Sequence, residues 1–122
     1  MRGRERTDLD RGSGTVLAIG LVAALATVAL ALATLAGALV GRERAVAAAD
    51  LAALAGAQAL IDGHGLPESC QAAAAIAQAM GAELTECARI PPDRLTAACR
   101  IGIDLPLLGR RIAEAEAVAG PP

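Results

Sequence analysis

The sequence predicts an α+β protein with a long N-terminal transmembrane helix that continues outward, a short second helix and a small antiparallel sheet. Three observations carry this prediction. The stretch from Gly12 to Gly41 contains no charged residue, the following stretch to Leu60 is rich in strong helix formers, and residues 95–105 alternate between apolar and polar positions.

Composition limits what the chain can build. It has 122 residues, of which 55% are hydrophobic, yet it contains no Phe, Tyr or Trp. The apolar stretch leaves only about 80 residues to fold in water, and small side chains bury little area per residue. We therefore expect a marginal core that needs a staple, a membrane or a partner, and no deep catalytic cleft.

Residues 14–40 are predicted to span a bilayer. Some 20 helical residues already cross the hydrocarbon core, so this run has length to spare. A helix buried in a soluble protein is the first alternative, but the remaining chain is too short to cover it on every face. A cleaved secretory signal with a site at Ala45-Val46-Ala47 is the second, although signal apolar regions usually have only about 7–15 residues.

Arginine placement predicts the orientation. Residues 1–13 form a basic leader with four arginines, whereas Arg42 and Arg44 alone closely follow the span; the four are Arg2, Arg4, Arg6 and Arg11. The leader is therefore expected in the cytoplasm, and the rest of the chain beyond about Gly41 outside it. Within the span, Gly20 and Ala24 are spaced to let another helix approach closely.

A helical extension is expected over residues 41–62, because Ala, Leu, Glu, Arg and Gln dominate and no Pro interrupts. One apolar face with helical spacing is predicted from Ala47, Leu51, Leu54 and Ile61. The extension should end at Asp62-Gly63-His64-Gly65, where the single histidine is read as a solvated turn residue.

Residues 63–122 are predicted to form a small extracytoplasmic α+β domain. Pro67 suits a first helical turn, and a short helix should run from there until Gly81 caps it. Strands are expected over residues 82–90 and 95–105, joined by Pro91-Pro92-Asp93-Arg94. A third strand is assigned to residues 111–118, although their alanines and glutamates suit a helix equally well.

Three cysteines, Cys70, Cys87 and Cys99, lie on the side of the membrane where disulfides persist. A Cys70–Cys87 bond would tie the short helix to the sheet, and a Cys87–Cys99 bond would cross the hairpin. The sequence does not choose between them. Their spacing does not fit a zinc site, and no base accompanies them to make a catalytic thiol.

No enzyme activity, cofactor or small-molecule substrate is predicted. The chain has no phosphate-binding loop or nucleophile elbow, and acidic pairs such as Glu83/Glu86 and Glu114/Glu116 are read as solvated faces. The net charge is −2 and no basic cluster lies beyond the leader, so nucleic acid is not expected as a partner.

Several motifs resemble those of a known family. These are the arginine-rich leader, Arg11-Gly12-Ser13-Gly14-Thr15-Val16 running into the apolar helix, Ala48-Ala49-Asp50-Leu51 after it, Cys70, Cys87 and the Ala119-Gly120-Pro121 ending. In this order and spacing they resemble TadE/TadG-like pilus-assembly proteins, and more closely the actinobacterial helicase/secretion neighbourhood TadE-like branch.

The resemblance implies a pseudopilin-like minor component of a tight-adherence (Flp-type) pilus or a related secretion apparatus. Its partners would be membrane lipid and other pilin-like or secretion-apparatus membrane proteins. The runner-up function is a single-pass accessory subunit of an unrelated membrane complex.

In related pilins a peptidase cuts after a glycine before the apolar helix, and a glutamate stands five residues beyond the cut. A cut between Gly12 and Ser13 would place Leu17 at that position. We therefore hypothesise that the chain stays in the membrane as an accessory or minor subunit. Mass spectrometry that finds Ser13 as the mature first residue would restore the processed-pilin interpretation.

Overall fold

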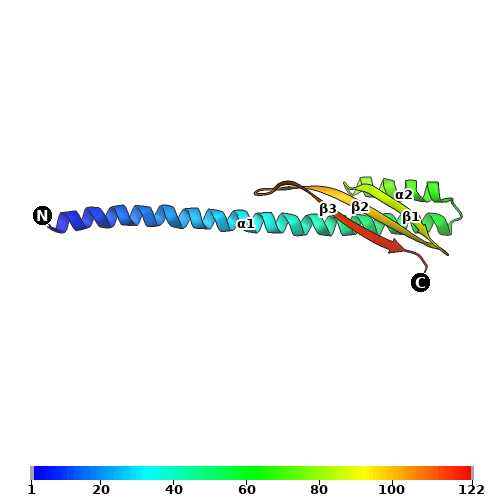
Figure 1. Cartoon of the computed structure of the whole chain (residues 1–122), viewed down its shortest axis with the longest axis horizontal. Helices are drawn as coiled ribbons and strands as arrows, with labels where there is room; N and C mark the ends of the chain where they lie inside the picture. The colour runs from blue at the N-terminus through cyan, green and yellow to red at the C-terminus, as the bar shows by residue number, and fades with distance from the viewer. Residues whose placement is uncertain (1, 122) are drawn as a thin grey trace.

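The protein was analysed as a computed structural model that describes the backbone of residues 2–121 and the side chains of residues 12–121. It contains helix α1 (Arg2–Ile61), helix α2 (Leu66–Ala79) and strands β1 (Glu83–Ile90), β2 (Arg94–Leu105) and β3 (Gly109–Ala119). The predicted α+β class and order of elements are confirmed. We call residues 62–121 the head; Figure 1 shows it gathered along the C-terminal part of α1.

Helix α1 is a single helix of 60 residues. At about 1.5 Å per residue it is about 90 Å long. It contains no Pro, and it ends where Gly63 adopts a left-handed φ of 92°, a conformation that glycine adopts without steric cost. The predicted continuation of the apolar helix into a longer rod is therefore present.

Residues 12–33 of α1 extend beyond the head. Residues 12–33 are all exposed, including Leu17 at 74% and Leu25 at 61%. The chain itself therefore does not cover this helix, as a helix buried inside a soluble protein would require. Thr27 and Thr34 each donate a hydrogen bond of 2.8 Å to the carbonyl four residues earlier, so these hydroxyls are satisfied within the helix.

Helix α2 packs alongside the end of α1. Pro67 lies in its first turn, Glu68 adds a favourable negative charge there, and Gly81 follows its end with a φ of 74°. Its buried residues, Ser69, Ala73 and Ala77, are all small. The two helices therefore approach closely without large interlocking side chains.

The sheet is an antiparallel meander in the order β1-β2-β3. Strand β2 pairs with β3 from Leu95↔Ala119 to Leu105↔Gly109 without a break, and with β1 from Ile90↔Arg94 to Glu83↔Arg100 with one irregularity near Glu86. The predicted inward face of β2 is confirmed at Leu95, Ala97, Cys99, Ile101 and Leu105, all of which are buried.

Strand β2 packs against glycines of α1. A Cβ added to Gly56 would lie 2.9 Å from Leu95, and one added to Gly37 would lie 3.0 Å from Leu105. At Gly41 the same position is already occupied by Ile103. One helical turn from Gly37 to Gly41 rises about 6 Å and two strand residues rise about 6.6 Å, so the successive side chains of the strand match successive glycines.

The buried face of the extension consists of alanines and not of leucines. The fully or almost fully buried residues here are Ala45, Ala48, Ala49, Ala52, Ala53 and Ala57. The apolar face predicted from Ala47, Leu51, Leu54 and Ile61 is not the core face, because Leu51, Leu54 and Ile61 are 45%, 59% and 57% exposed. Both sets have helical spacing, and the sheet lies on the side where small residues allow the closest approach.

The packing of β2 against the glycines of α1 can be tested directly. Gly56→Leu should destabilise the head by about 1–3 kcal/mol, because the new side chain meets Leu95 and the Ser69 carbonyl oxygen. Cys99 is the free, fully buried thiol of the described chain, so its labelling rate by a thiol reagent measures opening of the head. We expect that rate in detergent to rise about tenfold.

Gly20→Leu is the matched control, since a Cβ there meets nothing within 4 Å. Equal labelling rates for Gly56→Leu and the unmodified protein would contradict the seating of β2 on α1.

Candidate functional site on the apolar helix

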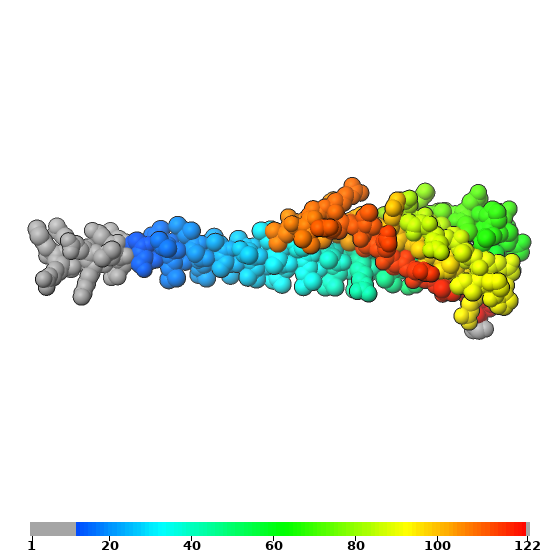
Figure 2. Space-filling view, viewed as in Figure 1, coloured from blue at the N-terminus to red at the C-terminus, as the bar shows by residue number. Residues whose placement is uncertain are grey.

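The candidate site is the exposed apolar part of α1, residues 12–40, which we call the bare segment. It lies within the one helix of the described chain that is long and apolar enough to cross a membrane. Figure 2 shows the blue part of this segment extending beyond the head, while the orange hairpin lies over its cyan end. Its length and exposure fit a single-pass membrane anchor.

Gly20 and Ala24, the candidate helix-packing residues, lie one turn apart on the bare segment and both are exposed. Nothing lies within 4 Å of a Cβ added at Gly20. The backbone is therefore open at this turn to the close approach of a second helix.

Gly12 and Ser13, the candidate processing residues, both lie within α1 and are exposed. The peptide bond that joins them is part of a continuous helix. Cleavage there would require local unwinding, because a protease acts on opened backbone. Leu17, four residues after Ser13, is exposed and offers an apolar surface but no charge.

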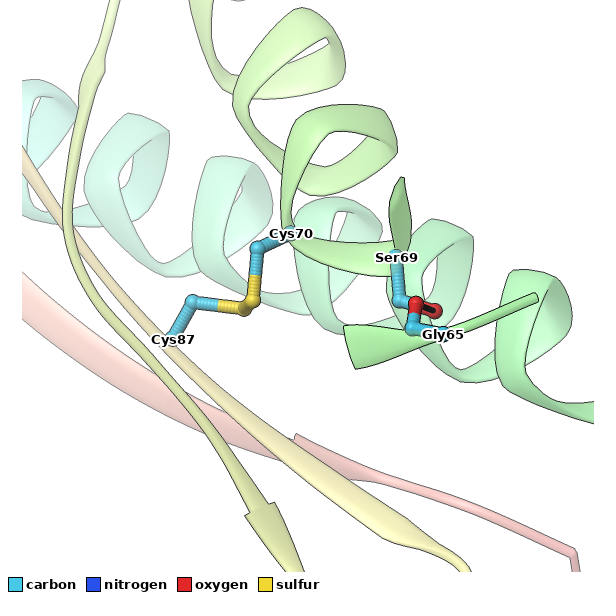
Figure 3. Close-up of a disulfide and its surroundings, with 4 residues drawn as sticks. All are labelled: Gly65, Ser69, Cys70 and Cys87. Atoms are coloured by element: carbon cyan, nitrogen blue, oxygen red, sulfur yellow. Dashed lines mark hydrogen bonds between the residues drawn. A yellow bond between two sulfur atoms is a disulfide. The ribbon is translucent and has the colours of Figure 1, made fainter. Parts of the chain in front are cut away.

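A disulfide joins Cys70 of α2 to Cys87 of β1, with a Cα–Cα distance of 5.9 Å (Figure 3). Of the two pairings left open by the sequence, this is the one that ties the short helix to the sheet. Beside it, the buried Ser69 hydroxyl donates a 2.9 Å hydrogen bond to the Gly65 carbonyl. The disulfide ties α2 to β1, and the hydrogen bond stabilises the first turn of α2.

Cys99 is free and fully buried on the helix-facing side of β2. Burial raises the pKa of its thiol, because the low-polarity surroundings disfavour the thiolate. The thiol is therefore protonated at neutral pH and unreactive while the head stays closed.

The polar side chains of the head make structural contacts. Arg100 donates two hydrogen bonds to Glu83 across β1 and β2, and Thr96 donates one of 2.8 Å to Glu116 across β2 and β3. His64 is exposed in the turn between the helices. Within residues 12–121, no three His, Cys, Asp or Glu side chains are grouped to hold a metal ion.

Sequence reasoning missed one exposed apolar feature, the loop between β2 and β3. Leu107 and Leu108 are 56% and 54% exposed there. The signal was present as Leu105-Pro106-Leu107-Leu108, an apolar run at a hairpin turn where polar residues are usual.

Removal of the disulfide tests its structural role. Cys70→Ser with Cys87→Ser should cost the head about 3 kcal/mol, the chain-entropy value for a loop of this length. Cys99 labelling should then accelerate about 100-fold, measured by mass spectrometry of the labelled peptide. Labelling at the rate of the unmodified protein would show that packing alone holds α2 on the sheet.

Comparison with known proteins identifies the same part of the chain. Residues 12–59 match the family model described as "Putative Flp pilus-assembly TadE/G-like". Comparison with curated proteins and with solved structures gave no match. The matched residues comprise the bare segment and most of the helix on which the head packs, so the resemblance to TadE/TadG-like pilus-assembly proteins that was read from the sequence is confirmed over this part of α1.

Proposed function

We propose that the chain is a non-catalytic, membrane-anchored minor pilin-like subunit or assembly factor of a tight-adherence (Flp-type) pilus or a related secretion system. The observation that carries the proposal is that the exposed apolar part of α1 and the family match lie in the same part of the chain. The bare segment, of which the head leaves residues 12–33 uncovered, falls inside the residues that match the pilus-assembly family.

Membrane insertion explains the bare segment physically. In water its exposed leucines and valines would cost about 25 cal/mol per Å² of apolar surface, whereas in a bilayer they are in their preferred solvent. Its backbone is hydrogen-bonded within the helix, and the hydroxyls of Thr27 and Thr34 each donate to a backbone carbonyl. These two hydroxyls therefore enter the lipid already paired.

The proposed orientation has the arginine-rich leader in the cytoplasm and the head outside. The positive-inside rule supports it, since four arginines precede the span and only Arg42 and Arg44 closely follow it. The Cys70–Cys87 disulfide supports it independently, because disulfides persist in oxidising extracytoplasmic compartments.

A released head is disfavoured by the packing. Cleavage after Ala47 would remove Gly41 and Ala45, which lie under the sheet. Ile103 would lose the surface on which it rests. The anchor and the core of the head are parts of one helix, so the head is best retained at the membrane.

Assembly is the proposed task because α1 offers a surface along its whole length. The side of α1 opposite the sheet exposes Leu51, Leu54 and Ile61 beyond the membrane, and the bare segment continues below them. Helices of other pilin-like subunits could pack along this strip through their own apolar faces.

Blocking the small-residue turn tests the proposal. Gly20→Leu with Ala24→Leu should abolish co-purification of the chain with the other membrane proteins of the pilus apparatus, because the added side chains keep a second helix away. Ala18→Leu with Ala29→Leu, on the opposite side of the helix, is the control and should leave co-purification intact.

Membrane insertion and slow Cys99 labelling should be unchanged in both variants. A chain that purifies from the membrane as a solitary monomer even without substitutions would contradict a role in assembly.

A further inference from the structure

The β2–β3 hairpin extends back along α1 toward the bare segment. Strand β2 runs antiparallel to α1, from Leu95 near Gly56 to Leu105 against Gly37. The loop 106–108 therefore lies at the level of Gly37 or beyond it, toward the N-terminus. Figures 1 and 2 show this end of the hairpin, orange in Figure 2, over the cyan part of α1 and away from the rest of the head.

Gly37 lies inside the charge-free run of α1, four residues before its end at Gly41. The polar start of that run, Gly12 to Thr15, places the beginning of the hydrocarbon core near Val16. A core of about 30 Å takes about 20 helical residues and then ends near Leu35. If the hydrocarbon core of the bilayer instead begins a few residues later in α1, it ends beyond Gly37. The hairpin loop therefore reaches the outer boundary of the bilayer, or passes it.

The loop has the chemistry of that boundary. Pro106, Leu107 and Leu108 are apolar, and both leucines are more than half exposed with no cover from the head. Gly109, with a φ of 69°, closes a three-residue hairpin turn, so the loop is short and held by the paired strands on each side. Two leucines at the tip of a supported hairpin are costly in water and favourable in lipid.

Basic residues form a belt just above the loop. Arg111 pairs in register with Ile103, which contacts Gly41, so Arg111 lies at the level where the charge-free run ends. Arg110 is its neighbour, and Arg42 and Arg44 follow Gly41 on the helix. Glu43 and Asp104 lie at the same level, so this region carries four positive and two negative charges. Such a belt complements the phosphates of lipid headgroups.

We propose that the loop 106–108 is a second membrane contact, in which Leu107 and Leu108 enter the outer leaflet beside α1 while Arg110 and Arg111 bind lipid phosphates. The inference rests on the proposed membrane anchoring by the bare segment. It adds that the head lies on the membrane surface in a fixed orientation and does not swing freely at the end of a rod.

The absence of aromatic residues makes the test clean, because one introduced Trp is the sole fluorophore of the chain. Leu108→Trp is made in the full chain and reconstituted into vesicles of equal parts phosphatidylcholine and phosphatidylglycerol, with and without brominated acyl chains. We expect blue-shifted emission and at least twofold quenching by the brominated lipid.

Two further Trp variants serve as negative and positive controls. Ile90→Trp, at the opposite end of the sheet next to Pro91, should emit as in water and stay unquenched; it controls for the preference of Trp itself for membrane interfaces. Leu25→Trp, in the bare segment, should be quenched. Slow Cys99 labelling in each variant verifies that the head is folded.

The outcomes separate the two claims. Quenched Leu25→Trp with unquenched Leu108→Trp would overturn the loop contact and leave the anchor standing. Blue-shifted but unquenched Leu108→Trp would mean that protein, not lipid, covers the tip, and would also overturn it. Unquenched Leu25→Trp would overturn the anchor itself.

The arginines are tested in the same background. Arg110→Gln with Arg111→Gln should lower the quenching of Leu108→Trp at least twofold, because the loop loses its headgroup contacts. Unchanged quenching would overturn their part in the proposal.

Discussion

The close approach of strand β2 to the glycine and alanine face of α1 is the contact on which the rest of the molecule depends. Leu95, Ile103 and Leu105 lie against Gly56, Gly41 and Gly37, at positions where any side chain on the helix would intrude. This contact sets the direction of β2, and the pairing of β1 and β3 with β2 then places the whole sheet. The hairpin loop reaches the end of the apolar run for the same reason.

A core built this way is thin. Its only fully buried side chains larger than alanine are, within the described residues, Leu95, Cys99 and Ser69. Alanines bury little area each, so the hydrophobic contribution per residue is small. The disulfide offsets this by restricting the unfolded chain, and it links α2 to β1.

The two parts of α1 have different surfaces. Residues 12–33 expose Leu, Val and Ile all round, which fits a bilayer, and residues 41–61 present small residues to the sheet and larger ones to the outside. Because the two halves are continuous through Gly41, any tilt of the anchor is transmitted to the head. Continuity also places the tip of the β2–β3 hairpin beside the apolar run, as the proposed second membrane contact requires.

Much of this was predictable from local sequence. The period of two in β2 identified its inward face, and the long run of helix formers without Pro predicted α1 as one rod. The third strand was uncertain because its alanines and glutamates suit a helix; unbroken pairing with β2 decides for a strand.

Long-range placement was not predictable. Leu51, Leu54 and Ile61 have helical spacing whether they face the sheet or the outside, and the choice of Cys70 over Cys99 as the partner of Cys87 depends on distances that no spacing reveals. The position of Leu107 and Leu108 beside the apolar run of α1 likewise follows only from the contact between Leu105 and Gly37.

The central claim is that α1 is one rigid helix from the membrane into the core of the head. Amide hydrogen–deuterium exchange, measured by mass spectrometry on the full chain in lipid nanodiscs, tests it most directly. We predict slow exchange without interruption from the bare segment through Gly41 to Ala57, because lipid protects the first part and the sheet protects the second. Fast exchange confined to the turn around Gly41, between two protected stretches, would contradict the account.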